Sequence, residues 1–185
     1  MESKWFKDYF KLYDGLSLND EIINQLIDLK KQIQEKAKEN SIFIFGNGGS
    51  AAIASHVAVD FSKNAKTNIM TFNEYAHITC LANDYGFNQW VAKTLEMYAK
   101  AGDMVILISS SGKSQNMVNA ANYARANQIS VVTFTGFDSN NPLKAIGDIN
   151  FWVDSNAYNI VEMIHQIWLL SVCDSIIGKA EYSAS

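Results

Sequence analysis

The sequence has few of the residues that cross-link or divide a chain. Of its 185 residues, only two are cysteine and one is proline. Cys80 and Cys173 have neither the spacing of a zinc-ligand pair nor that of a redox pair, so we expect two buried thiols in a reducing compartment. Pro142 is the single proline, and no Gly/Ser-rich stretch separates the chain into parts. These absences predict one undivided domain over residues 1–185.

The chain also lacks an excess of positive charge and an apolar targeting segment. Its formal net charge is −4, and no cluster of Lys and Arg offers a surface for direct binding of nucleic acid or an anionic membrane. The first five residues lack the apolar core of a signal peptide. The most apolar segment lies near the C-terminus, where Glu162, His165, Gln166 and Asp174 interrupt it, so we expect no membrane span. We therefore expect a cytoplasmic protein.

What the sequence does have is an alternation of short apolar runs with helical patterns. Strands are expected at residues 41–45, 68–72, 103–108, 130–135 and 148–153. Helices are expected in the first forty residues and at 50–63, 114–127 and 156–177, with a further helix that follows a loop at 83–87 and ends near residue 100. This order predicts an α/β fold, with a parallel sheet covered by helices on both faces and joined by right-handed crossovers.

The two ends of the chain carry the strongest helical patterns. Ser17–Asp20 has the form of a capping box, and the helix after it is amphipathic. The closing helix is apolar nearly all round, so it must be buried on most sides. In a chain of this size, that burial predicts a homo-oligomer in which residues 1–40 pack as a helical extension.

Two loops, Gly46–Ser50 and Ser109–Ser114, are the most informative segments. Each follows a predicted strand and precedes a predicted helix. Glycine lets the backbone approach a ligand, while hydroxyls and the first N–H groups of a helix supply hydrogen-bond donors. Because the carboxyl ends of parallel strands share one edge of a sheet, the two loops predict a single site for an anion such as a sugar phosphate. Neither the Walker A nor the dinucleotide-binding pattern is present, which argues against a nucleotide cofactor.

Two pairs of polar residues on predicted helices are candidates for chemistry. His56 and Asp60 are four residues apart, and Glu162 and His165 are three apart, so each pair shares a helix face. Either pair could bind a metal or transfer protons, or could be a local hydrogen-bonded or ionic contact. A buried carboxylate at position 162 requires a polar partner, because burial without one is costly.

The short polar side chains of Asn83 and Asp84, beside Gly86, could orient sugar hydroxyls or could form a turn or helix start. Lys113 could neutralise a phosphate or face solvent. His77 is expected in the core or at an interface.

Taken together, these segments resemble the sugar isomerase (SIS) domain family, and within it the bacterial phosphoheptose isomerases. The similarity covers nearly the whole chain. It rests on the motifs Gly46–Ser50 with His56, Asn83–Phe87, Ile108–Ser114 and Glu162-x-x-His165. The resemblance implies a three-layer αβα sandwich with a five-stranded parallel sheet, assembled as a tetramer with sites at subunit interfaces. It also implies conversion of sedoheptulose 7-phosphate to glycero-manno-heptose 7-phosphate through an enediol.

The resemblance further implies roles for individual residues. Phosphate binding is implied for Ser109, Ser110, Ser111 and Ser114, and contact with the substrate for Asn47, Gly48, Gly49, Ser50, Asn83 and Asp84. Asp60 is implied as the enediol base, with Glu162 or His165 assisting. Some members bind zinc, for which His56, Asp60 and Glu162 are the corresponding side chains.

Three positions depart from the family pattern. Asp60 stands where the family has glutamate, Glu162 where it has glutamine, and Leu170 where it has a catalytic histidine. The binding loops are therefore retained while the groups that transfer protons differ. Two hypotheses follow: a phosphoheptose isomerase, or a non-catalytic sugar-phosphate-binding protein or tetrameric adaptor similar to those that associate with the replication initiator. A third is isomerisation of a different phosphosugar.

Overall fold

The computed structural model describes residues 2–15 and 18–182, in which helices and strands alternate along the chain. The elements are α1 (Glu2–Lys11), α2 (Asp20–Lys36), β1 (Ile42–Gly46), α3 (Gly49–Lys63), β2 (Ile69–Met70), α4 (Tyr75–Tyr85), α5 (Trp90–Tyr98), β3 (Met104–Ser109), α6 (Gln115–Ala126), β4 (Ser130–Gly136), β5 (Ile149–Val153) and α7 (Tyr158–Ile177). The expected α/β class is confirmed.

The five strands form one parallel sheet in the order β2-β1-β3-β4-β5. The chain therefore runs outward from β1 in one direction to β2 and then, from β3, in the other direction to β5. The strand order reverses between β1 and β3, which pair from Ile42 opposite Met104 to Gly46 opposite Ile108. In open α/β sheets, ligands bind beyond the carboxyl ends of the strands at such a reversal.

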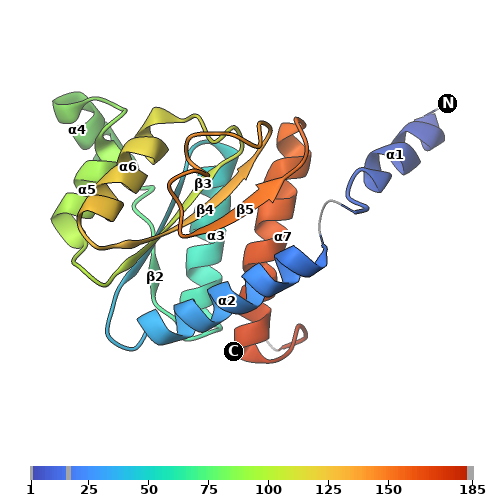
Figure 1. The fold of residues 1–185 in the computed structure, drawn as a ribbon, viewed down its shortest axis with the longest axis horizontal. Coiled ribbons are helices and arrows are strands. Elements are labelled where there is room, and N and C mark those ends of the chain that lie inside the picture. Colours follow the sequence, from blue (N-terminus) through green and yellow to red (C-terminus); the bar gives the residue numbers. More distant parts are fainter. Residues whose placement is uncertain (1, 16–17, 183–185) are drawn as a thin grey trace.

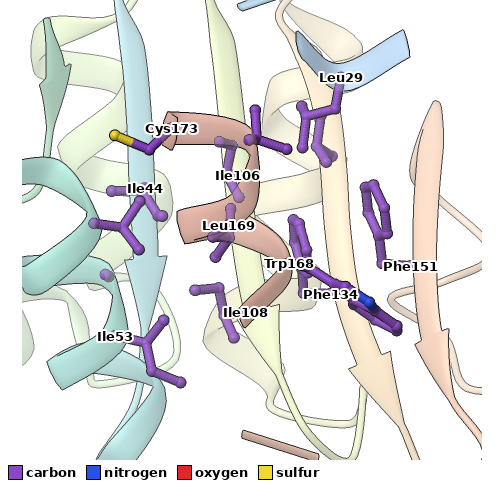
Figure 2. Packing of buried hydrophobic residues seen from close by; sticks show 14 of the residues in the cluster. Leu29, Ile44, Ile53, Ile106, Ile108, Phe134, Phe151, Trp168, Leu169 and Cys173 are labelled. Carbon is purple, nitrogen blue, oxygen red and sulfur yellow. The ribbon is translucent and has the colours of Figure 1, made fainter. Parts of the chain in front are cut away.

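Helices cover both faces of the sheet, so the expected three-layer sandwich is confirmed (Figure 1). The central strands β1, β3 and β4 are buried on both faces and alternate their side chains between two cores, whereas alternate residues of the edge strand β5 are only partly buried. Ile42 and Ile44 of β1 enter the core beneath α2, α3 and α7, whereas Phe43 and Phe45 enter the core beneath α4, α5 and α6. Figure 2 shows the first core, in which Trp168 lies close to Phe134 and Phe151.

The N-terminal helices differ from each other in burial. Asn19 caps α2 by accepting a hydrogen bond from the backbone N–H of Ile22 at 2.9 Å, while Ser17 of the expected capping box lies outside the described residues. Leu29 and Ile33 of α2 are fully buried in the core of their own subunit. In contrast, α1 has no buried residue and lies apart from the sheet in Figure 1. Within the expected N-terminal extension, α2 is therefore part of its own core, whereas α1 contributes only the partly buried Tyr9, which packs against that core.

One expected loop is a helix. Residues 83–85, predicted to be part of a loop, form the last residues of α4, which continues to Tyr85 and ends at Gly86. The missed signal is Glu74, whose carboxylate accepts a hydrogen bond from the N–H of His77 and caps the start of the helix. The expectation of a buried thiol at Cys80 is also wrong, because that side of α4 faces solvent, whereas Cys173 is buried as expected.

Within the single chain, the closing helix α7 is buried on one face and exposed on the other. Ile164, Trp168 and Leu169 pack into the core, whereas Met163 and Ile167 are 41% and 51% exposed. By length and composition alone α7 could cross a membrane, and 44% of its most apolar window is buried inside the fold. Core helices of globular proteins have the same length and composition. The exposed apolar residues on the other face of α7 leave a surface for a further contact.

Candidate functional site

The two glycine- and serine-rich loops meet at one cavity of about 300 Å³. It lies at the carboxyl ends of β1 and β3, where the strand order reverses. Its lining residues are Asn47, Gly48, Gly49, Ser50, Ile108, Ser109, Ser110, Ser111, Ser114, Tyr158 and Glu162. The structure thus brings together eight of the residues expected to contact substrate and one expected catalytic residue, Glu162. Tyr158 was not foreseen, because nothing in the sequence placed the start of the closing helix beside both loops.

Three helices begin at this cavity. Gly48, Ser114 and Ala157 occupy the N-cap positions of α3, α6 and α7, and none of their side chains makes a capping hydrogen bond. The first N–H groups of a helix need partners from outside the helix, and the positive end of the helix dipole lies there. Three such ends around one cavity favour an anionic ligand.

The serine hydroxyls offer further donors. Ser109 Oγ donates to Ser114 Oγ at 3.2 Å, and Ser111 Oγ accepts from the backbone N–H of Lys113 at 3.2 Å. Ser110 is 5% exposed, and its Oγ has no hydrogen-bond partner among the described residues. Buried polar groups in native proteins are almost always paired, because an unpaired one costs about 1–3 kcal/mol. A ligand oxygen at this position would satisfy Ser110.

Two glycines shape the cavity. A side chain at Gly49 would overlap the carboxylate of Glu162, so glycine allows α3 and α7 to approach each other here. Gly112 has a φ of +62°, a left-handed conformation that side chains rarely adopt, and a Cβ there would also overlap Asn141. The loop Ser109–Ser114, called the serine loop below, therefore requires glycine at position 112 for its turn.

Glu162 is the carboxylate that lines the cavity. Burial raises its pKa above the ordinary glutamate value, and a hydrogen bond from the Ser50 side chain partly opposes this rise. Desolvation favours the neutral form, whereas a donor stabilises the charged form. A carboxyl group whose pKa is raised above its ordinary value holds a proton more readily, which favours a role in proton transfer.

The His56–Asp60 pair lies outside the cavity of its own chain. His56 Nε2 is 3.3 Å from Asp60 Oδ2, and Gln166 Nε2 donates to His56 Nδ1 at 2.9 Å. Measured along α3 from Gly49, His56 lies about 10 Å and Asp60 about 16 Å away, at 1.5 Å per residue. Within one chain, Asp60 therefore cannot act on a ligand in this cavity.

The residues expected to bind zinc do not form a metal site within one chain. No group of three or more His, Cys, Asp or Glu side chains arranged to hold a metal occurs in residues 2–15 and 18–182. Glu162 faces Gly49 in the cavity, while both ring nitrogens of His56 are held by Asp60 and Gln166. The chemistry of this set does not fit a zinc ion in the single chain.

His165 is a core residue, which corrects its expected place in the site. It is fully buried, its Nε2 donates to the Thr135 carbonyl at 3.0 Å, and its ring lies near Phe134 and Trp168. Burial lowers its pKa to about 4, so it is neutral at physiological pH. Its position three residues after Glu162 turns it toward β4 rather than toward the cavity, so it is excluded from the site.

The remaining candidates also lie elsewhere. Asn83 and Asp84 are exposed on α4, where the Asn83 amide donates to Asp84 Oδ1 at 2.9 Å, and neither residue lines the cavity. Lys113 is exposed and its Nζ lies 3.4 Å from Asp138 Oδ2. His77 lies on α4, with its Nε2 2.8 Å from Thr94 Oγ1. Leu170 packs against the core.

Besides Tyr158, the structure adds Asn116, which the sequence gave no reason to single out. Asn116, the second residue of α6, exchanges two side-chain hydrogen bonds with Asn47 of the first loop. The partners are 69 residues apart, so no local pattern could have revealed the pair.

The chain is similar to known proteins along most of its length. Residues 9–136 match the SIS domain. A probable phosphoheptose isomerase of Thermoplasma acidophilum is 32% identical over 89% of this chain and 92% of its own length. The phosphoheptose isomerase of Aliarcobacter butzleri is 31% identical, covering 89% and 94%.

Solved structures share the fold. The phosphoheptose isomerase of Francisella tularensis superposes with a TM-score of 0.85 at 23% identity, covering 97% of this chain and all of its own. The enzyme of Neisseria gonorrhoeae superposes with a TM-score of 0.84 at 22% identity, covering 94% and 95%.

Proposed function

The chain belongs to the SIS domain family, and we propose that it is a phosphosugar isomerase acting on sedoheptulose 7-phosphate. The product would be glycero-manno-heptose 7-phosphate. Two relatives of about the same length carry the name phosphoheptose isomerase, one of them as probable. The observation that carries the proposal is the cavity, which joins an anion-binding loop to a carboxyl group of raised pKa.

The two ends of the cavity suit the two ends of such a substrate. The phosphate would lie against Ser110 and Ser114, where the N-terminus of α6 and the unpaired Ser110 hydroxyl donate to it. The sugar would extend toward Asn47 and Glu162. A phosphate held at one end fixes the distance to the carbonyl carbon, which is how binding energy positions a reacting group.

Glu162 is the proton carrier in this proposal. As carboxylate it removes a proton from C1 of the ketose, giving an enediolate, and it then delivers that proton to C2. The hydroxyl proton moves from O1 to O2 in the same conversion, so the aldose forms with no net gain or loss of atoms. The hydrogen bond from Ser50 holds the carboxylate toward the cavity. No step of this mechanism passes through a metal ion.

The residues that lie outside their own cavity have a role in an oligomer. We propose that His56, Asp60, Asn83 and Asp84 complete the cavity of a neighbouring subunit in a homotetramer. His56 and both residues on α4 are exposed, as contact with another subunit requires. In this arrangement Asp60 remains a second candidate for proton transfer.

The surface of the chain supports such an assembly. Trp5, Phe6 and Phe10 are 58–65% exposed on α1, and Met163 and Ile167 are exposed on α7. Large exposed apolar groups gathered on helices mark interaction surfaces. We propose that residues 1–185 form one SIS unit, that α1 packs on another subunit, and that the protein acts in the cytoplasm.

A second function is favoured by one observation. None of the three histidines, His56, His77 and His165, lines the cavity in the described part of the chain, and Leu170 is partly buried against the core. A protein that binds a sugar phosphate without converting it, or a tetrameric adaptor, would need the serine loop but no second proton carrier.

Proton NMR of the protein incubated with sedoheptulose 7-phosphate distinguishes the two functions. Aldose anomeric signals that appear with the wild-type protein and disappear with Glu162→Gln would support the isomerase. Ligand line broadening without product would support the binding protein. The absence of both effects would overturn both proposals. A Ser171→Ala variant, changed on the same helix outside the cavity, serves as the matched control.

A further inference from the structure

Asn47 and Asn116 form a reciprocal amide pair across two parts of the site. Asn47 Nδ2 donates to Asn116 Oδ1 at 3.0 Å, and Asn116 Nδ2 donates to Asn47 Oδ1 at 2.9 Å. Asn47 follows β1 in the first loop and lines the cavity, whereas Asn116 is 1% exposed and does not line it. Asn116 is therefore beyond direct contact with a ligand in the cavity.

The pair fixes the orientation of the Asn47 amide. A side-chain amide has two N–H donors and two acceptor lone pairs, and this pair uses one of each on both residues. Rotating the Asn47 amide alone by half a turn would place nitrogen against nitrogen and oxygen against oxygen. The second donor and second lone pair of Asn47 therefore keep fixed directions, and Asn47 is the member of the pair that lines the cavity.

The pair also holds the two loops at a fixed separation. Asn116 is the second residue of α6, two positions after Ser114 of the serine loop. Its bonds to Asn47 join the start of this helix to the loop after β1, so the two strands at the reversal point are linked beyond their carboxyl ends. The distance from the serine loop to Asn47 then depends on this contact.

We propose that Asn116 is a positioning residue that sets how Asn47 meets the sugar hydroxyls of a phosphosugar. This inference rests on the proposed function, in which the serine loop binds phosphate and Asn47 faces the sugar. It predicts that Asn116 affects recognition of the sugar and leaves recognition of the phosphate unchanged. A purely structural role in folding would affect both.

The test compares two ligands by isothermal titration calorimetry. Inorganic phosphate probes the serine loop alone, whereas sedoheptulose 7-phosphate probes both loops. For Asn116→Leu and Asn116→Ala, we expect sugar-phosphate affinity to fall about tenfold, the value of one well-formed hydrogen bond, with phosphate affinity within about twofold. Two variants are used because their side chains differ in size, so the test still holds if one of them fails to fold. Asn119→Ala is the matched control. Asn119 lies on the same helix as Asn116, but its amide donates to the backbone carbonyl of Asn88, so this variant should leave both affinities unchanged.

A double-mutant cycle tests the route of the effect. In an Asn47→Ala background, Asn116→Ala should cause no further loss of sugar-phosphate affinity, because its partner is already gone. Additive losses would overturn the inference, as would equal losses for both ligands or unchanged affinity for both. A wild-type protein that binds phosphate but no sugar phosphate also overturns it. Binding of neither ligand by the wild type would overturn the proposed function and this inference together.

Discussion

Replacing His165 by glutamine should remove a large part of the acid sensitivity of this fold. His165 is fully buried, donates from Nε2 to the Thr135 carbonyl at 3.0 Å, and has a pKa lowered to about 4 by burial. In the unfolded chain the same side chain has a pKa of about 6.5. Between these two values the unfolded state binds more protons than the folded state, so the free energy of unfolding falls as the pH is lowered from 6.5 toward 4.

The size of this effect follows from the two pKa values. Complete titration of His165 costs about 3 kcal/mol of stability, most of which is lost between pH 7.5 and pH 4.5. Glutamine carries a nitrogen close to the position of Nε2, so it can keep the hydrogen bond to Thr135 while having no charge to gain. The variant should therefore have nearly wild-type stability at pH 7.5 and should be less sensitive to acid.

Urea unfolding at both pH values, at one fixed protein concentration, measures this difference. The wild type should lose about 2–3 kcal/mol more than His165→Gln on acidification. Trp168→Phe is the control, because it changes the same core while leaving His165 in place, and it should lower stability equally at both pH values. Parallel losses for the wild type and His165→Gln would refute the burial of a neutral histidine here and would reopen its place in the site.

Three further results are expected. Ser110→Ala should weaken phosphate binding about tenfold in calorimetry, because its buried hydroxyl loses a ligand bond, and unchanged affinity would remove the serine loop from phosphate binding. Glu162→Gln should lower kcat at least about a hundredfold in the NMR assay and should retain its affinity for the sugar phosphate. The kcat/KM of the wild type should rise with pH through a pKa above that of ordinary glutamate, because the base must be ionised. A kinetic pKa at or below the ordinary glutamate value would argue against Glu162 as the base. Trp168→Ala should lower the free energy of unfolding by about 3–5 kcal/mol in urea, and a loss below 1 kcal/mol would contradict its full burial.

The sequence by itself determined the fold class, because each strand is a short apolar run between helical patterns. It also determined the positions of the two ligand-binding loops. Gly48 and Gly49 in one loop, and the serines before Gly112 in the other, are typical of ligand-binding loops at a strand-to-helix junction. Both patterns consist of residues that are neighbours in the sequence, so they can be recognised without knowledge of the fold. The helix α4 was missed because its cap, Glu74, lies just before a segment of weak periodicity.

Only the tertiary structure decided which polar residues share the site. Glu162 and His165 are equally plausible site residues in the sequence, since they lie three residues apart on one helix. In the structure, the Glu162 side chain lines the cavity and the His165 side chain lies in the core. Asp60 follows the first loop closely along the chain, but the rise of α3 carries it away from the cavity. Asn116 meets Asn47 only because β1 and β3 are neighbours in the sheet. The directions of side chains and the proximity of distant segments are set by packing, which no local pattern encodes.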